Sequence, residues 1–362
     1  MQGAGLGVCE MEFLAVPQES SQPEIAEAFV DVAGARLHYL RAGAGPPMLL
    51  IHGLVGSSQN WRNNIGALAS SASVYAPDLL NTGKSQRVSG LDTSLKAIAN
   101  RMVASMDALG LGAVDIVAHS HGGAIALMLA ALRPQRVRRL ILFAPANPHS
   151  RSGDRLVRFY SSRWGGLALR MLPYLPAPIQ RIALGKLYGG PDRVMESCLR
   201  TYTEVLSDSS TVHHILSILR CWFVEMSKLR RALRRVARIP TLLVWGDRDC
   251  TVSLSSGIRL HRRLPASELI VVPGRPLRVR RSAGGGQPYH AGMAWPPSPA
   301  CHIARHVARP ASRRTQRVAG RVHSAPAPSG QGCLHRRQRQ RRRGRRCCGH
   351  PKSVPWSLGV AA

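Results

Sequence analysis

Apolar positions between residues 29 and 274 follow two periods that alternate along the chain. Runs typical of strands occupy residues 29–32, 37–40, 48–51, 73–77, 114–118, 140–143, 240–245 and 268–272. Helical spacing of apolar residues separates most of these runs, at 61–68, 94–109, 122–132 and 253–264. Strands that alternate with helices over short connections predict a parallel sheet covered by helices. The predicted fold class is therefore α/β, with a mostly parallel, doubly wound sheet.

Two segments depart from this alternation. Residues 148–238 show helical spacing throughout, broken by prolines and by Gly189-Gly190-Pro191, and predict a helical cap inserted into the sheet domain. After Gly274 the periodicity stops. The predicted organisation is a flexible leader (1–28), a first part of the α/β core (29–147), the cap (148–238), a second part of the core (239–274) and a disordered tail rich in Arg, Pro and Gly (275–362).

The charge of the chain is concentrated in that tail. Fifty Lys and Arg against 19 Asp and Glu give a net charge of +31, and the last acidic residue is Glu268. Residues 275–362 hold 18 Arg and one Lys with no acidic residue, which is +19 of the total. The sequence therefore joins two compositions, and each needs its own functional interpretation.

Other features exclude whole classes of protein. No apolar run approaches the roughly 20 residues that a membrane-spanning helix needs. The N-terminal region carries five Glu and lacks the basic-then-apolar opening of a secretory signal. Eight Cys are scattered without the spacing of a disulfide framework. We expect a cytoplasmic protein with no membrane partner.

The segment from Val117 to Ala124 carries the strongest chemical signal. It reads Val-Ala-His-Ser-His-Gly-Gly-Ala, with a strand pattern before it and a helix pattern after it. A serine in that position, Ser120, lies on a sharp strand-to-helix turn that exposes its hydroxyl, and small residues two before and two after let the backbones approach. Ala118 and Gly122 meet this need. We predict that Ser120 is a nucleophile.

A serine nucleophile needs a base, an orienting acid and donors for the oxyanion. The segment His52-Gly53-Leu54 follows a buried strand and has the pattern of a loop that supplies one donor, the Leu54 N–H; the second would be the N–H of His121 at the following helix N-terminus. His52 is either the base or, as we favour, a ring that shapes this loop and borders the pocket. His119 and His121 flank Ser120 and diverge from it, so we expect their side chains to line the pocket or pack.

The orienting acid is expected at the end of a later strand. Trp245-Gly246-Asp247-Arg248-Asp249 offers two carboxylates. We favour Asp249 and interpret Asp247 as a turn residue that accepts local backbone N–H bonds.

These motifs occur in an order that resembles the α/β-hydrolase superfamily. The resemblance covers residues 29–274 and is carried by His52-Gly53, Trp61, residues 78–85, residues 118–123 and residues 245–249. It implies a capped serine hydrolase that forms an acyl-enzyme on Ser120, because an Asp would stand there in the dehalogenase and epoxide-hydrolase branches. The resemblance leaves open substrates in which an ester, lactone, thioester, amide or C–C bond is cleaved, and it implies no cofactor. Asn81 stands where the family commonly has Gly, and Asn tolerates the left-handed backbone that such a turn requires.

In this architecture the cap shapes the substrate pocket. Trp164 and Trp222 are the aromatic residues we expect there, within a mainly apolar surface that fits a small hydrophobic substrate, although the apolar residues of the cap could equally form its own core. The basic stretch 228–238 has helical spacing and is more typical of a solvated helix face than of an anion site.

The C-terminal part departs from the family pattern. The resemblance implies a catalytic His in a short turn after the last strand, but the chain continues Gly274-Arg275-Pro276-Leu277-Arg278 and has no His before His290. His302 and His306 are also out of place. The abrupt change to an acid-free composition is typical of translation in a shifted reading frame. One alternative hypothesis is thus a catalytically defective protein that keeps the fold without its base.

The tail admits two further hypotheses. Its cluster at 336–346 would bind polyanions without reading sequence, which makes a nucleic-acid-associated basic protein the second alternative, one we disfavour. Cys333, His335, Cys347, Cys348 and His350 are zinc-capable, but their spacing does not make the usual Cys-x₂₋₄-Cys pair, and we predict no metal site.

Overall fold

The computed structural model describes residues 23–272 except 152, 189–193, 195, 248 and 250. An eight-stranded sheet in the order β1-β2-β4-β3-β5-β6-β7-β8 forms its centre. The first two strands pair antiparallel with each other, and β2 also runs antiparallel to β4. All remaining pairs are parallel. The predicted α/β class with a mostly parallel sheet is confirmed.

The strands are β1 (Ala26–Val32), β2 (Ala35–Ala42), β3 (Pro47–Ile51), β4 (Ser73–Pro77), β5 (Val114–His119), β6 (Val137–Phe143), β7 (Thr241–Gly246) and β8 (Ser267–Val272). Strand β6 begins three residues before the expected run at 140, because Arg138 and Arg139 conceal the apolar pattern there. Both guanidinium groups lie on the buried Asp115 carboxylate of β5, at 3.1 and 2.7 Å. Their charges are thus paired across the sheet rather than exposed.

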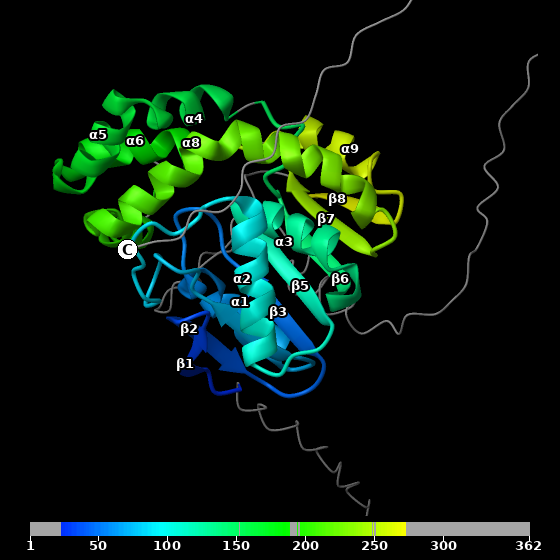
Figure 1. Cartoon of the computed structure of the whole chain (residues 1–362). Coiled ribbons are helices and arrows are strands. Elements are labelled where there is room, and N and C mark those ends of the chain that lie inside the picture. The colour runs from blue at the N-terminus through cyan, green and yellow to red at the C-terminus, as the bar shows by residue number, and fades with distance from the viewer. Residues whose placement is uncertain are drawn as a thin grey trace, which may run out of the picture. The chain divides into compact units, whose positions relative to one another are not determined.

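The helices are α1 (Arg62–Ala69), α2 (Leu95–Ala108), α3 (His121–Leu132), α4 (Asp154–Ser161), α5 (Arg163–Met171), α6 (Ala177–Tyr188), α7 (Glu196–Ser207), α8 (Ser209–Ala232) and α9 (Leu254–His261), with short 3-10 turns that include η1 (Ser58–Trp61), η3 (Leu172–Tyr174) and η5 (Leu233–Val236). Figure 1 shows α2 and α3 lying across one face of the sheet. No helix in the described ranges has the length and apolar character to cross a bilayer.

The core lies on both faces of the sheet because the central strands are apolar at successive positions. In β3, Leu49 and Ile51 belong to the large cluster that also contains α2 and α3, whereas Met48 and Leu50 belong to the opposite cluster with Ile65 of α1. Helix α3 is buried at every residue from His121 to Ala131. A helix that is apolar on all sides needs partners on all sides, and α3 has the sheet, α2, α8 and η5 around it.

Helices α4 to α8 lie between β6 and β7 in the chain and correspond to the predicted cap. They carry a cluster of their own, in which Leu169 and Leu172 pack with Leu216 and Leu219 of α8. Helix α8 is tied to the rest of the structure by polar contacts as well: Thr211 Oγ1 donates to the Asn81 carbonyl, and the buried Glu225 carboxylate accepts the Leu95 N–H. These contacts fix the cap against the loops that follow β4.

Candidate active site

Ser120 occupies the turn between β5 and α3. Its backbone has φ 52° and ψ −120°, a conformation that costs on the order of 1–3 kcal/mol in a residue with a side chain. Three hydrogen bonds hold it: the Ser120 N–H donates to the Phe143 carbonyl, and the Ser120 carbonyl accepts from Gly123 and Ala146. The turn is therefore strained and rigidly held, and its side chain is half-buried.

Two glycines after the serine allow α3 to lie directly on the strands. A Cβ on Gly122 would fall 2.4 Å from the His52 carbonyl oxygen and 2.5 Å from that of Ile51. A Cβ on Gly123 would fall 2.4 Å from the Cβ of Pro145. Both positions exclude a side chain unless the backbone moves, which is the steric reason for glycine after the serine.

The loop after β3 lies beside the same turn. A Cβ built on Gly53 would be 3.5 Å from the Ser120 Cβ, so the Gly53-Leu54 segment borders the serine. Neither the Leu54 nor the His121 backbone N–H finds an acceptor among the described residues. The His121 N–H also lies at the positive end of α3. Both groups are available to hold an oxyanion.

His52 is buried beneath that loop with both ring nitrogens engaged. Its Nδ1 is 2.8 Å from the Gly53 carbonyl, and its Nε2 accepts the Leu79 N–H at 3.1 Å. Burial lowers the pKa of the His52 imidazole, which outweighs the opposing charge of Asp78. The ring ties the loop to the segment after β4, and its role as a loop-shaping histidine rather than a base stays a prediction.

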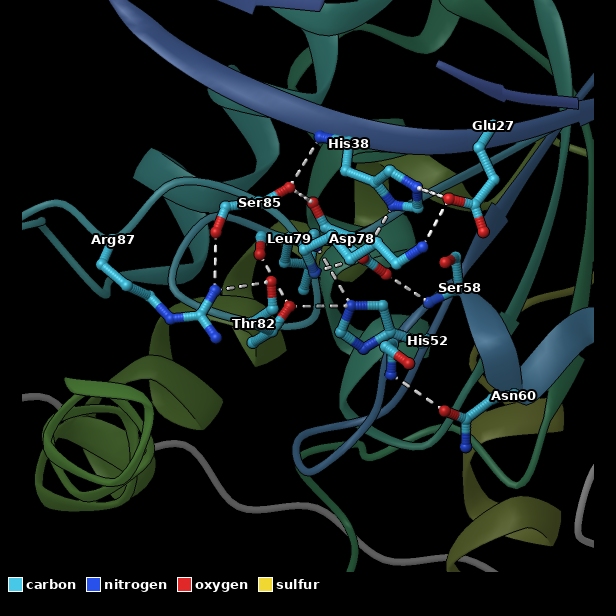
Figure 2. Close-up of polar contacts among 12 residues, drawn as sticks. Glu27, His38, His52, Ser58, Asn60, Asp78, Leu79, Thr82, Ser85 and Arg87 are labelled. Carbon is cyan, nitrogen blue, oxygen red and sulfur yellow. Dashed lines mark hydrogen bonds and ion pairs between the residues drawn. The ribbon is translucent and has the colours of Figure 1, made fainter. Parts of the chain in front are cut away.

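A buried carboxylate, Asp78, joins these segments at the end of β4. It accepts the Ser58 N–H on Oδ1, and on Oδ2 it accepts the Lys84 N–H and lies 2.9 Å from His38 Nδ1 (Figure 2). Burial alone would raise the pKa of Asp78, but the His38 hydrogen bond, the His52 ring and these N–H groups hold it below its usual range. The loop that follows β3 and the loop that follows β4 are therefore held by one ionised group.

Asn81 lies in the second of these loops with φ 66°, in the left-handed region. Its side chain donates to the Val88 carbonyl and accepts the Val88 N–H, which closes the loop. The substitution of Asn for the family's usual Gly is thus accommodated as expected.

The candidate acid lies two strands from Ser120 along the same edge of the sheet. Asp249 Oδ1 accepts the N–H groups of Thr251 and Val252 at 2.8 and 2.9 Å. The Trp245 indole fixes the same turn by donating to the Val252 carbonyl. Asp249 is half-buried and Asp247 is exposed. The Asp249 carboxylate is thus held by its own turn, and its role as the orienting acid stays a prediction.

The residues expected to supply the base follow β8, which ends at Val272. They lie outside the described residues, as do His290, His302 and His306. The zinc-capable residues of the tail and its Arg-rich cluster also lie there. Within the described ranges no group of His, Cys, Asp and Glu side chains could hold a metal ion.

On the cap side, aromatic and imidazole rings meet the serine turn. The His121 ring stacks on Trp222 of α8, with centroids 5.7 Å apart. Burial, then the charges of His214 and His52, lowers the pKa of His121 to about 3. His119 is half-buried against Gly53. Trp222 thus contacts the residue that follows Ser120, and His119 lies against Gly53; their pocket roles stay predictions.

Trp164 lies elsewhere. Its side chain is 66% exposed on α5, with the Arg163 guanidinium over its ring. No contact in the described structure joins it to the Ser120 turn, and the pocket role expected for it stays a prediction.

Comparisons with known proteins agree with this arrangement. A family model for the alpha/beta hydrolase fold matches residues 46–275. This chain belongs to that family. An uncharacterised protein of Mycobacterium tuberculosis is 31% identical over 257 residues, which are 68% of this chain and 74% of the relative.

Other relatives have named activities. The 2-hydroxy-6-oxo-2,4-heptadienoate hydrolase of Pseudomonas putida is 39% identical over 63% of this chain and 81% of its own length. Among solved structures, a 2-hydroxy-6-oxo-6-phenylhexa-2,4-dienoate hydrolase from Rhodococcus covers 69% of this chain and 91% of its own, with a TM-score of 0.58 at 24% identity. At that identity the likeness shows the fold.

Sequence reasoning missed the Asp78 centre and its partner His38. A usable signal was present: Asp78 follows a buried strand directly, as do Ser120 and the acids after β7. His38 lies between Leu37 and Tyr39 in β2 and is fully buried.

Proposed function

We propose that this protein is a serine hydrolase that cleaves an ester-like bond (a carboxylic ester, lactone or thioester) or a C–C bond of a small hydrophobic substrate through an acyl-enzyme on Ser120. The observation that carries the proposal is the strained Ser120 turn, bordered by two backbone N–H groups without acceptors in the described structure. A serine on a turn whose backbone is held, next to two such donors, matches the needs of carbonyl attack.

The reaction would begin with attack of Ser120 Oγ on the substrate carbonyl carbon. A base takes the hydroxyl proton, and the oxyanion accepts hydrogen bonds from the Leu54 and His121 N–H groups. Collapse of the tetrahedral adduct breaks the bond to the leaving group, which takes up the proton. Water then attacks the acyl-enzyme by the same route and releases the acid. Asp249, whose position at the end of β7 is fixed by its own turn, would orient the base.

Relatives favour one part of this substrate range. Two hydrolases among the relatives, 40% and 39% identical, are named for 2-hydroxymuconate semialdehyde and for 2-hydroxy-6-oxo-2,4-heptadienoate, the first over 36% of this chain and the second over 63%. A third relative, 39% identical over 36% of this chain, is named as the dihydrolipoyllysine-residue acetyltransferase component of an acetoin cleaving system. The compounds for which the two hydrolases are named are both small oxo compounds with a polar group. We therefore place such oxo-dienoates beside short p-nitrophenyl esters as the first substrates to test.

The test compares Ser120→Ala with Ser70→Ala in the full chain. Ser70 is an exposed serine whose hydroxyl donates to the Ala67 carbonyl. We expect Ser120→Ala to reduce turnover on the order of 10³-fold or more and Ser70→Ala to leave it unchanged. Mass spectrometry after treatment with a p-nitrophenyl phosphate triester should place the adduct on the Ser120 peptide. Unchanged turnover in Ser120→Ala would refute the assignment.

A second candidate is the same fold without its base. It is favoured by the sequence after Val272, where Arg and Leu replace the expected imidazole, and neither side chain takes up a proton at neutral pH. The experiment compares the chain as written with a chain that continues in the alternative reading frame from codon 275. We expect the chain as written to be slower on the order of 10³-fold. Equal rates would show that a different imidazole acts as the base.

A further inference from the structure

Helix α5 of the cap is apolar on two sides. One side packs inward through Gly165, Gly166 and Leu169, which are buried. The other side presents Trp164, Leu167 and Met171, which are 66%, 49% and 47% exposed. Positions i, i+3 and i+7 lie on one face of a helix, so these three side chains form a continuous apolar stripe in solvent.

Further exposed apolar side chains lie in the segments of the cap next to α5 in the chain. Exposed large apolar side chains concentrate in residues 159–182, which hold seven of the twelve in the described structure: Phe159, Trp164, Leu167, Met171, Tyr174, Ile179 and Ile182. We call this set the cap apolar surface. Ile179 and Ile182 share one face of α6 by the same spacing. Single exposed apolar residues are ordinary, whereas a concentration of this kind marks an interaction surface.

The segment that carries this surface has charges of one sign, although Arg181 of α6 is paired with Glu196 of α7. Residues 155–191 contain no Asp or Glu and hold six basic residues. In the described structure the Arg163 guanidinium lies 5.2 Å from the centre of the Trp164 ring, and that of Arg158 lies 5.0 Å from the centre of the Phe223 ring. Neither arginine forms an ion pair with a carboxylate among the described residues. Basic groups thus border the exposed aromatic rings.

We propose that the cap apolar surface binds an anionic phospholipid surface, with α5 lying in the plane of the interface. The side chains of Trp164, Leu167 and Met171 insert between the acyl chains, while the bordering arginines pair with lipid phosphates. Trp, Leu and Met on one side of a helix and Arg at its edges form the composition of interfacial helices. Peripheral binding of this kind needs no spanning segment, and none is found in the described ranges. The proposal departs from the sequence-based expectation of no membrane partner, which considered spanning helices alone.

Charge separates this partner from the other occupants of an apolar surface. A second copy of the chain would meet the surface through a twofold axis, which brings the same arginines face to face. A nucleic acid would satisfy the arginines but would leave the aliphatic side chains Leu167, Met171 and Ile182 without apolar partners. An anionic lipid surface satisfies both. The inference does not depend on the hydrolase proposal, because binding requires no chemistry at Ser120.

The test measures flotation of the full chain with vesicles of phosphatidylcholine that contain about 30% phosphatidylglycerol. The Arg-rich residues 275–362 are present in every variant and attract anionic lipid by charge, so binding is also measured at about 0.5 M salt, where charge attraction is largely screened. The variant is Trp164→Ser/Leu167→Ser/Met171→Ser. Its matched control is Phe29→Ser/Ile258→Ser, which removes exposed apolar residues of β1 and α9 outside the cap.

We expect the cap variant to lose salt-resistant binding by about tenfold or more and the control to bind as the original chain does. Brominated acyl chains should quench the fluorescence of the original chain more than that of Trp164→Phe, because Trp164 enters the lipid. Equal salt-resistant binding of the cap variant and the original chain would overturn the proposal. The proposal would also be overturned if the original chain sedimented as a dimer and did not bind vesicles, while the cap variant sedimented as a monomer.

Discussion

Replacement of His121 by Phe would show how strongly one buried imidazole limits the acid stability of the fold. The His121 ring is 2% exposed and stacks on Trp222, and its Nδ1 has no hydrogen-bond partner in the described structure. Burial, together with the charges of His214 and His52, lowers the pKa of His121 to about 3. Phe keeps an aromatic ring against Trp222 and removes the titrating group.

The size of the effect follows from the two pKa values. In the unfolded chain a histidine has a pKa of about 6.5, so at high pH both states are neutral and His121 contributes nothing to pH dependence. Between about 6.5 and the folded value, the unfolded chain binds a proton that the folded chain does not, and stability falls by about 1.4 kcal/mol per pH unit. By pH 5 the loss from His121 relative to pH 8 is about 2 kcal/mol.

Urea unfolding of the original chain and His121→Phe between pH 8 and pH 5 measures this term. The difference in unfolding free energy between the two proteins should shift by about 2 kcal/mol in favour of the Phe variant as the pH falls. The same two proteins compared between pH 8 and pH 9, above the pKa of an unfolded histidine, provide the control, and the difference in unfolding free energy should stay constant there. A difference that stays constant down to pH 5 would refute the reasoning.

Two further substitutions test the contacts that hold the site. Asp78→Asn removes the charge from all three contacts and turns an amide NH₂ towards at least one of the N–H donors. It should destabilise the fold by about 2–4 kcal/mol in urea unfolding, against less than about 1 kcal/mol for the exposed Asp107→Asn. Equal losses would argue against the buried centre. Gly123→Ala should lower the free energy of unfolding by about 1–3 kcal/mol, because the added Cβ clashes with Pro145. The control Gly112→Ala has nothing within 4 Å of its added Cβ and should leave stability unchanged or slightly raised. An unchanged stability of Gly123→Ala would contradict the steric argument.

Local pattern and turn chemistry predicted most of the sheet and the serine turn. The apolar run at 48–51 fits a strand that is buried on both faces, and no other element of that length. The structure has β3 there. The His-Ser-His-Gly-Gly segment requires a close approach of helix and strand, and the structure shows that approach at Gly122 and Gly123. These features depend on neighbours in sequence, which is why the sequence reveals them.

Features that depend on distant neighbours could not be predicted in the same way. The Asp78–His38 pair joins residues 40 positions apart, and only the packing of β2 against β4 makes it visible. From their spacing in the sequence, the apolar residues of α5 could equally line a pocket or form the core of the cap. Which of them are buried depends on the helices that pack on one side of α5 and leave the other exposed.

The contacts that shape the site come from a limited part of the chain. Ser120 is held by Phe143, Gly123 and Ala146, and the loop of Leu54 is held through His52 and the Asp78 centre. All these partners precede residue 272, as do the Thr251 and Val252 N–H groups that donate to Asp249. The contacts that shape the nucleophile turn and place the oxyanion donors are thus separate from the segment expected to supply the base. A chain in which only the sequence after Val272 changes should keep this geometry and differ in the rate of proton transfer, which is why the reading-frame comparison tests catalysis rather than folding.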